Sequence, residues 1–224
     1  MRLAVRFIAS TLIGLAFFGA VLFVPAGTLD YRQGWAFLAV FVVTTLVPSG
    51  FLAVTDPATL QRRMHAGPTA ETRPAQRFAA VGFTAVVLGC VIVSALDHRF
   101  GWSTVPAPAV VVGLALVAAG LGGAQWVIFQ NRYAAANITV EADQPLVSTG
   151  LYAVVRHPMY TAVTVMMLGT PPALGSWWGW IALGPMLAVL AVRILDEEAM
   201  LTEQLPGYRQ YRAQVRYRLL PHVW

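Results

Sequence analysis

Long apolar stretches separated by short polar loops constrain the fold of this 224-residue chain more than any other feature. A helix needs about 20 mostly apolar residues to cross the hydrocarbon core of a bilayer. Hydrophobic residues make up 58% of the chain and charged residues 11%, and no polar segment is long enough for a separate soluble domain. We therefore expect an all-α fold and one integral membrane domain over residues 1–224. Four spans are clear: Leu3–Val24, Trp35–Val54, Phe78–Leu96 and Ala107–Phe129.

A helical hairpin is predicted in the C-terminal part of the chain. Apolar character returns at Met159–Pro172 and resumes over Trp177–Ile194. The pair Pro171-Pro172 cannot continue a helix, and the glycine and serine that follow permit a tight connection, so we expect two antiparallel helices broken at the prolines. The chain then forms a polytopic bundle of about six transmembrane helices with an interfacial C-terminal tail.

The arginines predict the orientation of this bundle, because loops that stay in the cytoplasm carry an excess of basic residues. All fifteen basic residues are Arg, since the chain has no Lys. Six spans with both termini inside leave only Arg32 and Arg99 outside and place the other thirteen on the cytoplasmic side. The Lys-free, Ala-, Val- and Gly-rich composition is typical of a GC-rich bacterial genome. We therefore expect an integral protein of a bacterial inner membrane whose C-terminal polar region faces the cytoplasm.

Composition excludes several chemistries. Without Lys there is no phosphate-loop lysine, Schiff base or pyridoxal phosphate linkage. The single Cys90 lies in an apolar run, so the sequence offers no disulfide, no cysteine-rich zinc site and no iron–sulfur cluster, and we predict no metal. The arginines lie at the ends of apolar segments, which favours membrane lipids and not nucleic acid as partners. His65 and His98 are expected to be solvated loop residues.

A short interfacial helix is predicted over Asp56–Met64. Asp56 is suited to cap a helix and Pro57 to its first position, and the segment ends on the basic pair Arg62-Arg63. This helix would follow the second span at the membrane surface.

Polar residues concentrate in the segment Asn137–Glu198, more heavily than a passive helix bundle needs. Pro158 is suited to the first position of a helix, which puts Arg156 and His157 just outside the helix N-terminus, where backbone N–H groups favour an anion. Arg156 would add a bidentate cation there; the alternative role is a basic anchor at the membrane surface. The hairpin, rising about 22 Å and returning about 30 Å at 1.5 Å per residue, brings Glu197 back near their level.

The second helix of the hairpin ends in an acidic triplet, Asp196-Glu197-Glu198. Arg193 and Glu197 are four residues apart and can pair on one helix face. Three adjacent acids are costly at a negatively charged leaflet, and Arg193 compensates only one of them, so a ligand cation is a plausible second partner. An arginine for a carboxylate, a glutamate for a cation and tyrosines for a flat ring would suit S-adenosylmethionine, although spacing alone does not establish that ligand.

Three ordered motifs lie in the C-terminal part of the chain: LVSTGLYAVVRHPMY over 146–160, then Arg193-x-x-x-Glu197-Glu198-x-x-Leu201, and then Pro206-Gly207-Tyr208-x-x-Tyr211 leading to Val215, Arg218 and Pro221. With these motifs the run from about Asn137 to Trp224 resembles the isoprenylcysteine carboxyl methyltransferase family and the related phospholipid N-methyltransferases, whereas the first hundred residues carry no such signature. The resemblance implies that 130–224 is the catalytic, cofactor-binding region and that 1–129 forms four variable transmembrane helices.

The resemblance implies an integral membrane methyltransferase with S-adenosyl-L-methionine as cofactor. It implies Arg156 and Glu197 as the pair that frames the reaction centre and Arg193 as the substrate-side arginine. Which of Glu197 and Glu198 dominates stays open. The residues that it implies for cofactor binding are Asn137, Gln144, Pro145, Leu146, Val147, Tyr152, His157, Pro158, Met159, Tyr160, Glu197 and Glu198.

The methyl acceptor stays open at this stage. Two departures from the family pattern, Leu151 within Gly150-Leu151-Tyr152 and Ala162 in place of a glycine, could reshape the site. A lipophilic or small carboxylate, amine or thiol would fit, and no protein partner is implied. The alternatives are a membrane reductase of the steroid or sterol type that binds a nicotinamide cofactor, and a non-enzymatic membrane protein in which the polar cluster is structural.

Overall fold

The computed structural model describes residues 2–64, 73–133 and 144–224, and these residues form helices connected by turns and loops, with no strand among them. Two short 3₁₀ turns, Gly150–Ala153 and Trp178–Ala182, precede the two helices of the hairpin. The α-helices are α1 (Arg2–Ala26), α2 (Arg32–Thr55), α3 (Pro57–Met64), α4 (Pro74–Phe100), α5 (Ala107–Gln130), α6 (Pro158–Ala173), α7 (Leu183–Gln204) and α8 (Tyr208–Gln214).

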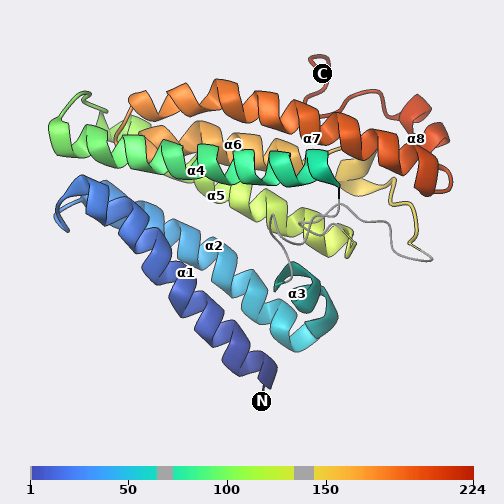
Figure 1. Ribbon diagram of the computed structural model, residues 1–224, viewed down its shortest axis with the longest axis horizontal. Coiled ribbons are helices and arrows are strands. Elements are labelled where there is room, and N and C mark those ends of the chain that lie inside the picture. Colours follow the sequence, from blue (N-terminus) through green and yellow to red (C-terminus); the bar gives the residue numbers. More distant parts are fainter. Residues whose placement is uncertain (1, 65–72, 134–143) are drawn as a thin grey trace.

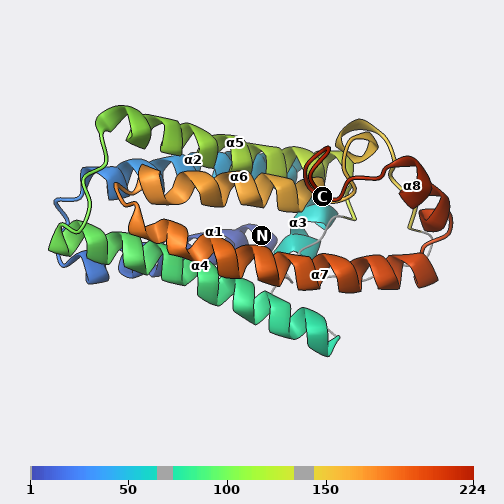
Figure 2. The ribbon, with the colours of Figure 1, turned by 90° about the horizontal axis from the view of Figure 1, so that it is seen from above.

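Four helices form the main body of the molecule. Helices α4, α5, α6 and α7 run side by side along the long axis, whereas α1 and α2 cross them obliquely (Figures 1 and 2). Within this arrangement α6 packs against α5, and α7 packs against α4. Helix α8 and the C-terminal tail lie at the end of the bundle where α6 begins (Figure 2). This end therefore collects the polar segments that the sequence singled out.

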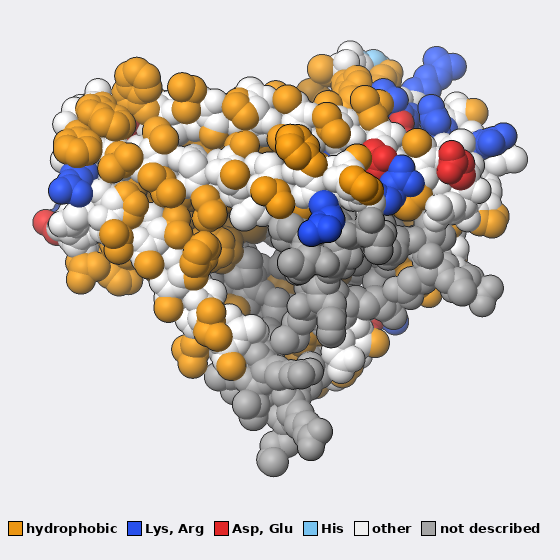
Figure 3. Space-filling view, viewed as in Figure 1, with side chains coloured by type: hydrophobic (Ala, Val, Ile, Leu, Met, Phe, Trp, Pro, Cys, Tyr) orange, Lys and Arg blue, Asp and Glu red, His pale blue; other side chains and the backbone are white. Residues whose placement is uncertain are grey.

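The helices fit a membrane protein, as predicted. Five of them in the described part of the chain, α1, α2, α4, α5 and the 3₁₀ turn continued by α7, are long and apolar enough to cross a bilayer. Helix α6 has 16 residues, which is short for a span. Apolar side chains cover the middle of the face formed by α4 and α7, while charged side chains gather toward its ends (Figure 3).

The hairpin forms as predicted, and its first helix ends one residue after the proline pair where a break was predicted, although both prolines still belong to its last turn. Helix α6 continues through Pro171 and Pro172 to Ala173. Pro172 has no N–H to donate to the Leu168 carbonyl four residues earlier. The indole Nε1 of Trp180, beyond the turn, donates to that carbonyl instead at 3.0 Å. A side chain of the 3₁₀ turn that leads into α7 thus replaces the missing helical bond.

Helices α5 and α6 approach one another closely through glycines. A Cβ atom at Gly120 would lie 2.5 Å from the Met166 nitrogen and 2.6 Å from the Ala162 oxygen. A Cβ at Gly169 would lie 2.6 Å from the Gly113 oxygen. Small residues allow such backbone contacts between membrane helices, where van der Waals packing replaces the hydrophobic effect as the driving force. This packing holds α6, and the residues just before it, in place.

A buried polar network closes the end of the bundle opposite α8. Asp97 accepts hydrogen bonds from the backbone N–H of Ser103 at 2.8 Å and from the Ser176 hydroxyl at 2.6 Å. The Tyr31 hydroxyl donates to the Leu174 carbonyl at 2.5 Å, and its ring stacks on His98 at 3.9 Å between centroids. The prediction of His98 as a solvated loop residue is therefore wrong, because it lies on the last turn of α4 against Tyr31. His65 lies outside the described residues.

The short helix predicted at Asp56–Met64 is present as α3. Asp56 Oδ1 accepts from the Thr59 N–H at 3.2 Å, and Asp56 Oδ2 accepts from the Thr59 hydroxyl at 2.9 Å, which is the expected capping arrangement. Leu60 packs with Leu52 of α2 and Ile128 of α5. The helix therefore folds back onto the bundle beside the start of α6.

The close packing of α5 on α6 predicts opposite effects of two neighbouring Gly→Ala changes. Gly120→Ala should lower the free energy of unfolding by about 1–3 kcal/mol, because the new methyl group overlaps the α6 backbone. Gly122→Ala is the matched control: a Cβ there meets nothing within 4 Å, so stability should stay the same or rise slightly. Unfolding of the purified protein in detergent measures both, and equal stability of the two variants would contradict the packing.

Candidate functional site

The residues predicted from the C-terminal motifs meet where α6 begins and the C-terminal tail crosses it. The backbone N–H groups of Arg156 and His157 donate to the carbonyls of Tyr217 and Arg218, both at 2.9 Å. One turn later the Thr161 hydroxyl donates to the Leu219 carbonyl at 2.7 Å. Pro158 occupies the first turn of α6, as predicted. The tail is therefore part of the walls of this region.

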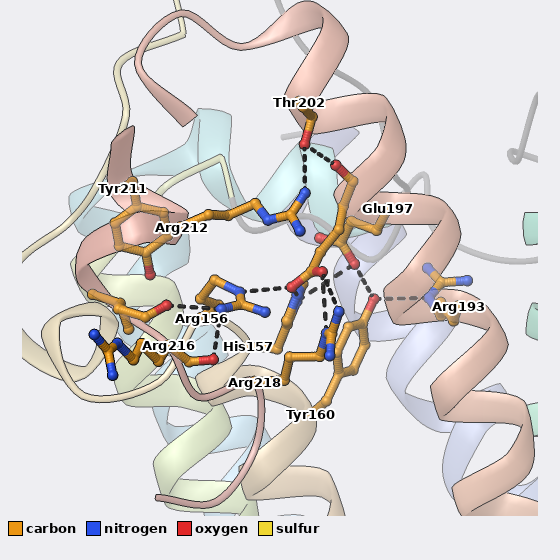
Figure 4. Close-up of polar contacts among 12 residues, drawn as sticks. Arg156, His157, Tyr160, Arg193, Glu197, Thr202, Tyr211, Arg212, Arg216 and Arg218 are labelled. Carbon is orange, nitrogen blue, oxygen red and sulfur yellow. Dashed lines mark hydrogen bonds and ion pairs between the residues drawn. The ribbon is translucent and has the colours of Figure 1, made fainter. Parts of the chain in front are cut away.

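Glu198 is the centre of a buried ion cluster. Its Oε1 accepts from Arg156 Nε at 2.7 Å and lies 3.3 Å from His157 Nε2. Its Oε2 accepts from Arg218 Nε at 3.1 Å (Figure 4). The Glu198 side chain is 4% exposed. A carboxylate this deeply enclosed needs such partners to offset its desolvation, so the cluster binds α6, α7 and the tail to one another.

Arg156 is fully engaged in this cluster and the tail. Besides Glu198, its Nη1 donates to the carbonyls of Val215 and Arg216, both at 2.8 Å (Figure 4). The residue is 7% exposed, which does not fit a basic anchor at the membrane surface. The structure pairs Arg156 with Glu198, whereas the family resemblance coupled Arg156 with Glu197.

Glu197 has a different environment from its neighbour. Its Oε2 accepts from the Tyr160 hydroxyl at 2.7 Å and lies 3.9 Å from His157 Nδ1. The same Tyr160 oxygen accepts from Arg193 Nε at 2.9 Å, so the hydroxyl lies between Arg193 and Glu197 (Figure 4). The Glu197 side chain is 21% exposed. The prediction that the hairpin returns Glu197 to the level of His157 is confirmed.

Asp196, the first acid of the triplet, points to helix α4. Asp196 Oδ2 accepts from Arg73 Nε at 3.0 Å, and Oδ1 accepts from Arg73 Nη2 at 2.5 Å. Gln76 Nε2 also donates to Asp196, at 2.5 Å, and to the Arg193 carbonyl at 3.2 Å. Arg73 and Gln76 were missed from the sequence, because nothing local distinguishes them; they become partners only when α4 packs against α7.

The segment before α6 and helix α8 form an apolar cluster beside the ion cluster. Leu146 and Tyr152 pack with Leu205, Tyr208 and Tyr211. The Tyr211 hydroxyl donates to the Tyr152 carbonyl at 2.8 Å. Burial raises the pKa of Tyr152 to about 12, so its hydroxyl stays protonated near neutral pH. Two of the predicted cofactor residues therefore share a core with α8.

The remaining predicted cofactor residues are dispersed. Met159 packs with Leu52, Leu60 and Ile128, on the side of α6 that faces α2, α3 and α5. Its side chain is thus not brought to the ion cluster. Asn137 lies outside the described residues. Pro145 is exposed, and Gln144 and Val147 are half-buried, in the segment that leads to the 3₁₀ turn.

Arg218 is a further member of the ion cluster. It stands in the third motif, but the resemblance implied no function for it. Its backbone carbonyl accepts from His157 and its side chain binds Glu198. The ring of Trp224 lies 5.1 Å from its guanidinium carbon. The only sequence signal was its place in the third motif. Among the described residues no three His, Cys, Asp or Glu side chains are grouped so as to hold a metal ion.

A polytopic helical membrane protein with a charged cluster at one end of a C-terminal hairpin is the class that fold and site define. Comparison with known proteins narrows this class. The family model for phospholipid methyltransferase matches residues 108–207. A protein-S-isoprenylcysteine O-methyltransferase of Schizosaccharomyces pombe is 37% identical over 75 residues, which cover 33% of this chain and 32% of that protein. The C-terminal part of the chain is therefore similar to known methyltransferases, as its motifs predicted, and the match spans about a third of the curated relative.

The two adjacent glutamates should differ sharply in their effect on stability. Glu198→Gln leaves the buried Arg156 and the partly exposed Arg218 without their counter-charge, and should lower the free energy of unfolding by about 3–5 kcal/mol. Glu197→Gln, with a hydroxyl as its closest partner, should cost about 1 kcal/mol or less. Denaturant unfolding of both variants in the same detergent measures the difference. Similar losses in the two variants would refute the assignment of Glu198 as the structural acid.

Proposed function

We propose that this protein is an S-adenosylmethionine-dependent methyltransferase that works within the membrane and methylates a lipophilic or small acceptor. The observation that carries this proposal is the contrast between the two glutamates. Glu198 is enclosed by Arg156, Arg218 and His157, whereas Glu197 next to it stays partly exposed beside Tyr160 and His157. A carboxylate held in place but still accessible is suited to meet a cationic ligand.

The donors and surfaces of the site fit the proposed cofactor. Its amino group or sulfonium would find a carboxylate in Glu197, and the stacked rings of His157 and Tyr160, with centroids 5.6 Å apart, offer a flat surface. The buried Tyr208 hydroxyl has no hydrogen-bond partner in the structure and is available to a ligand. The comparisons support the same conclusion, since both lead to methyltransferases.

In this mechanism the protein acts mainly by positioning. The cofactor, when bound, supplies a methyl group already activated by its sulfonium. The cluster around Glu198 fixes α7 against the start of α6, and so holds Glu197 and Tyr160 rigidly at the reaction centre. Rigid placement in a dry site accounts for much of the acceleration of a displacement between two bound reactants.

The acceptor side is assigned to Arg193. Its Nε donates to the Tyr160 hydroxyl at 2.9 Å, so its positive charge lies at the hydroxyl edge of the ring on whose face His157 stacks. A carboxylate acceptor would need only to be oriented by this charge. An amine or thiol acceptor would also have to lose a proton. Glu197 Oε2 and His157 Nδ1, which lie 3.9 Å apart, are the candidate bases that would accept it. An apolar acceptor would reach the site sideways from the bilayer.

Binding of S-adenosylhomocysteine to the purified protein tests the proposed cofactor. Calorimetry should show binding to the wild type, and Glu197→Gln should weaken it by about tenfold or more, because the charged amino group of S-adenosylhomocysteine loses its carboxylate partner. Glu203→Gln, an exposed acid on the same helix, is the matched control and should bind normally. A folded wild type that binds no S-adenosylhomocysteine would refute the methyltransferase proposal.

We propose further that the site faces the cytoplasm of a bacterial cell, as the arginine distribution predicts. Two single-cysteine variants in a Cys90→Ala background test this orientation. Gln204→Cys lies exposed at the site end, and Thr104→Cys lies exposed at the opposite end of the bundle. In intact spheroplasts a membrane-impermeant maleimide should label only Thr104→Cys. Labelling of Gln204→Cys alone would contradict this proposal and would indicate that the site faces the outside of the cell.

A further inference from the structure

A buried hydroxyl without a partner stands out in the apolar cluster beside the site. Tyr208 is 3% exposed, yet its hydroxyl makes no hydrogen bond in the structure. Buried polar groups are nearly always paired, because leaving one unpaired costs the desolvation of that group. The orphan is specific to this residue: Tyr211, on the same helix and equally buried, donates its hydroxyl to the Tyr152 carbonyl at 2.8 Å.

The surroundings place this hydroxyl on the cofactor side of the site. The ring of Tyr208 packs in a cluster that includes Leu146 and Tyr152, both implied cofactor residues. The segment before α6 also passes close to the start of α8, since a Cβ at Gly207 would lie 3.4 Å from Leu146 Cδ2. Arg193, on the proposed acceptor side, donates instead to the Tyr160 hydroxyl.

The electrostatic environment indicates how this hydroxyl interacts. Burial, followed by the nearby negative charges of Glu198 and Glu197, raises the pKa of Tyr208 well above its usual value. The group therefore stays protonated and keeps a hydrogen to donate as well as lone pairs to accept.

Two other buried side chains in the described part of the chain have a polar atom without a hydrogen-bond partner, and neither lies in the apolar cluster beside the site. Gln76 lies on α4 and already binds Asp196 and the Arg193 carbonyl through its amide nitrogen. Gln125 lies on α5. Neither belongs to the cluster around Leu146 and Tyr152. Of these three groups, the Tyr208 hydroxyl is therefore the one that a ligand at this site could hydrogen-bond.

We propose that the Tyr208 hydroxyl hydrogen-bonds a polar atom of the bound cofactor, so that Tyr208 is a binding residue contributed by the Pro206-Gly207-Tyr208 turn. This inference rests on the proposed function, because it takes S-adenosylmethionine as the ligand. It gives α8 a role in ligand binding besides packing. Binding would then supply the hydrogen bond that the free protein lacks at this position.

The pair Tyr208→Phe and Tyr211→Phe tests the proposal, because each variant keeps its ring and loses only a hydroxyl. In the free protein, Tyr208→Phe should unfold at the same temperature as the wild type or slightly higher, since an unpaired buried hydroxyl is removed. Its affinity for S-adenosylhomocysteine should fall about three- to tenfold, the equivalent of one hydrogen bond. Tyr211→Phe should instead lower the unfolding temperature, because the Tyr152 carbonyl loses its donor.

Calorimetric titration and thermal unfolding in one detergent give both readouts for all three proteins. Wild-type affinity in Tyr208→Phe would overturn the inference while leaving the proposed function intact. A loss of thermal stability in Tyr208→Phe as large as that in Tyr211→Phe would also overturn it, because the hydroxyl would then have a structural partner. Absence of S-adenosylhomocysteine binding by the folded wild type would instead overturn the proposed function and, with it, the role of Tyr208.

Discussion

The buried carboxylate of Glu198 is the interaction on which the rest of the site depends. It joins three parts of the chain that are far apart in sequence: the start of α6 through Arg156 and His157, the body of α7, and the C-terminal tail through Arg218. An enclosed charge is strongly destabilising when any one partner is removed. The three segments are therefore locked to one geometry, and the side chains that they carry toward a ligand share that rigidity.

The acidic triplet shows how one turn of helix serves three purposes. Successive residues of an α-helix are rotated by about 100°, so three adjacent acids must point in different directions. Asp196 turns to α4 and pairs with Arg73, Glu198 turns into the ion cluster, and Glu197 turns to Tyr160. Two of the acids thus hold the helix in place on both sides. The third is left in a fixed position with part of its surface accessible.

The hairpin brings Glu197 to this position because both of its ends are anchored. At the far end, Asp97 binds Ser176 in the turn, and the Trp180 indole replaces the helical bond that Pro172 lacks. Along its length α6 is held against α5 by backbone contacts at Gly113, Gly120 and Gly169. These contacts prevent α6 from sliding along α5, and so set the height at which His157 meets α7. The apolar packing of the bundle and the polar chemistry of the site are thereby coupled.

Sequence alone determined the membrane class, the helical spans, the hairpin and the residues that gather at its open end, because apolar length, helix periodicity and proline position are local properties. The family motifs pointed to Arg156, His157, Tyr160, Arg193 and the glutamates, and the structure brings these side chains together at the start of α6. Tertiary structure alone decided which glutamate pairs with Arg156, that Arg73 and Gln76 hold Asp196, and that α6 continues through its prolines. It also showed that Tyr208 keeps an unpaired hydroxyl. Each of these depends on contacts between helices distant in sequence, and such contacts leave no local pattern.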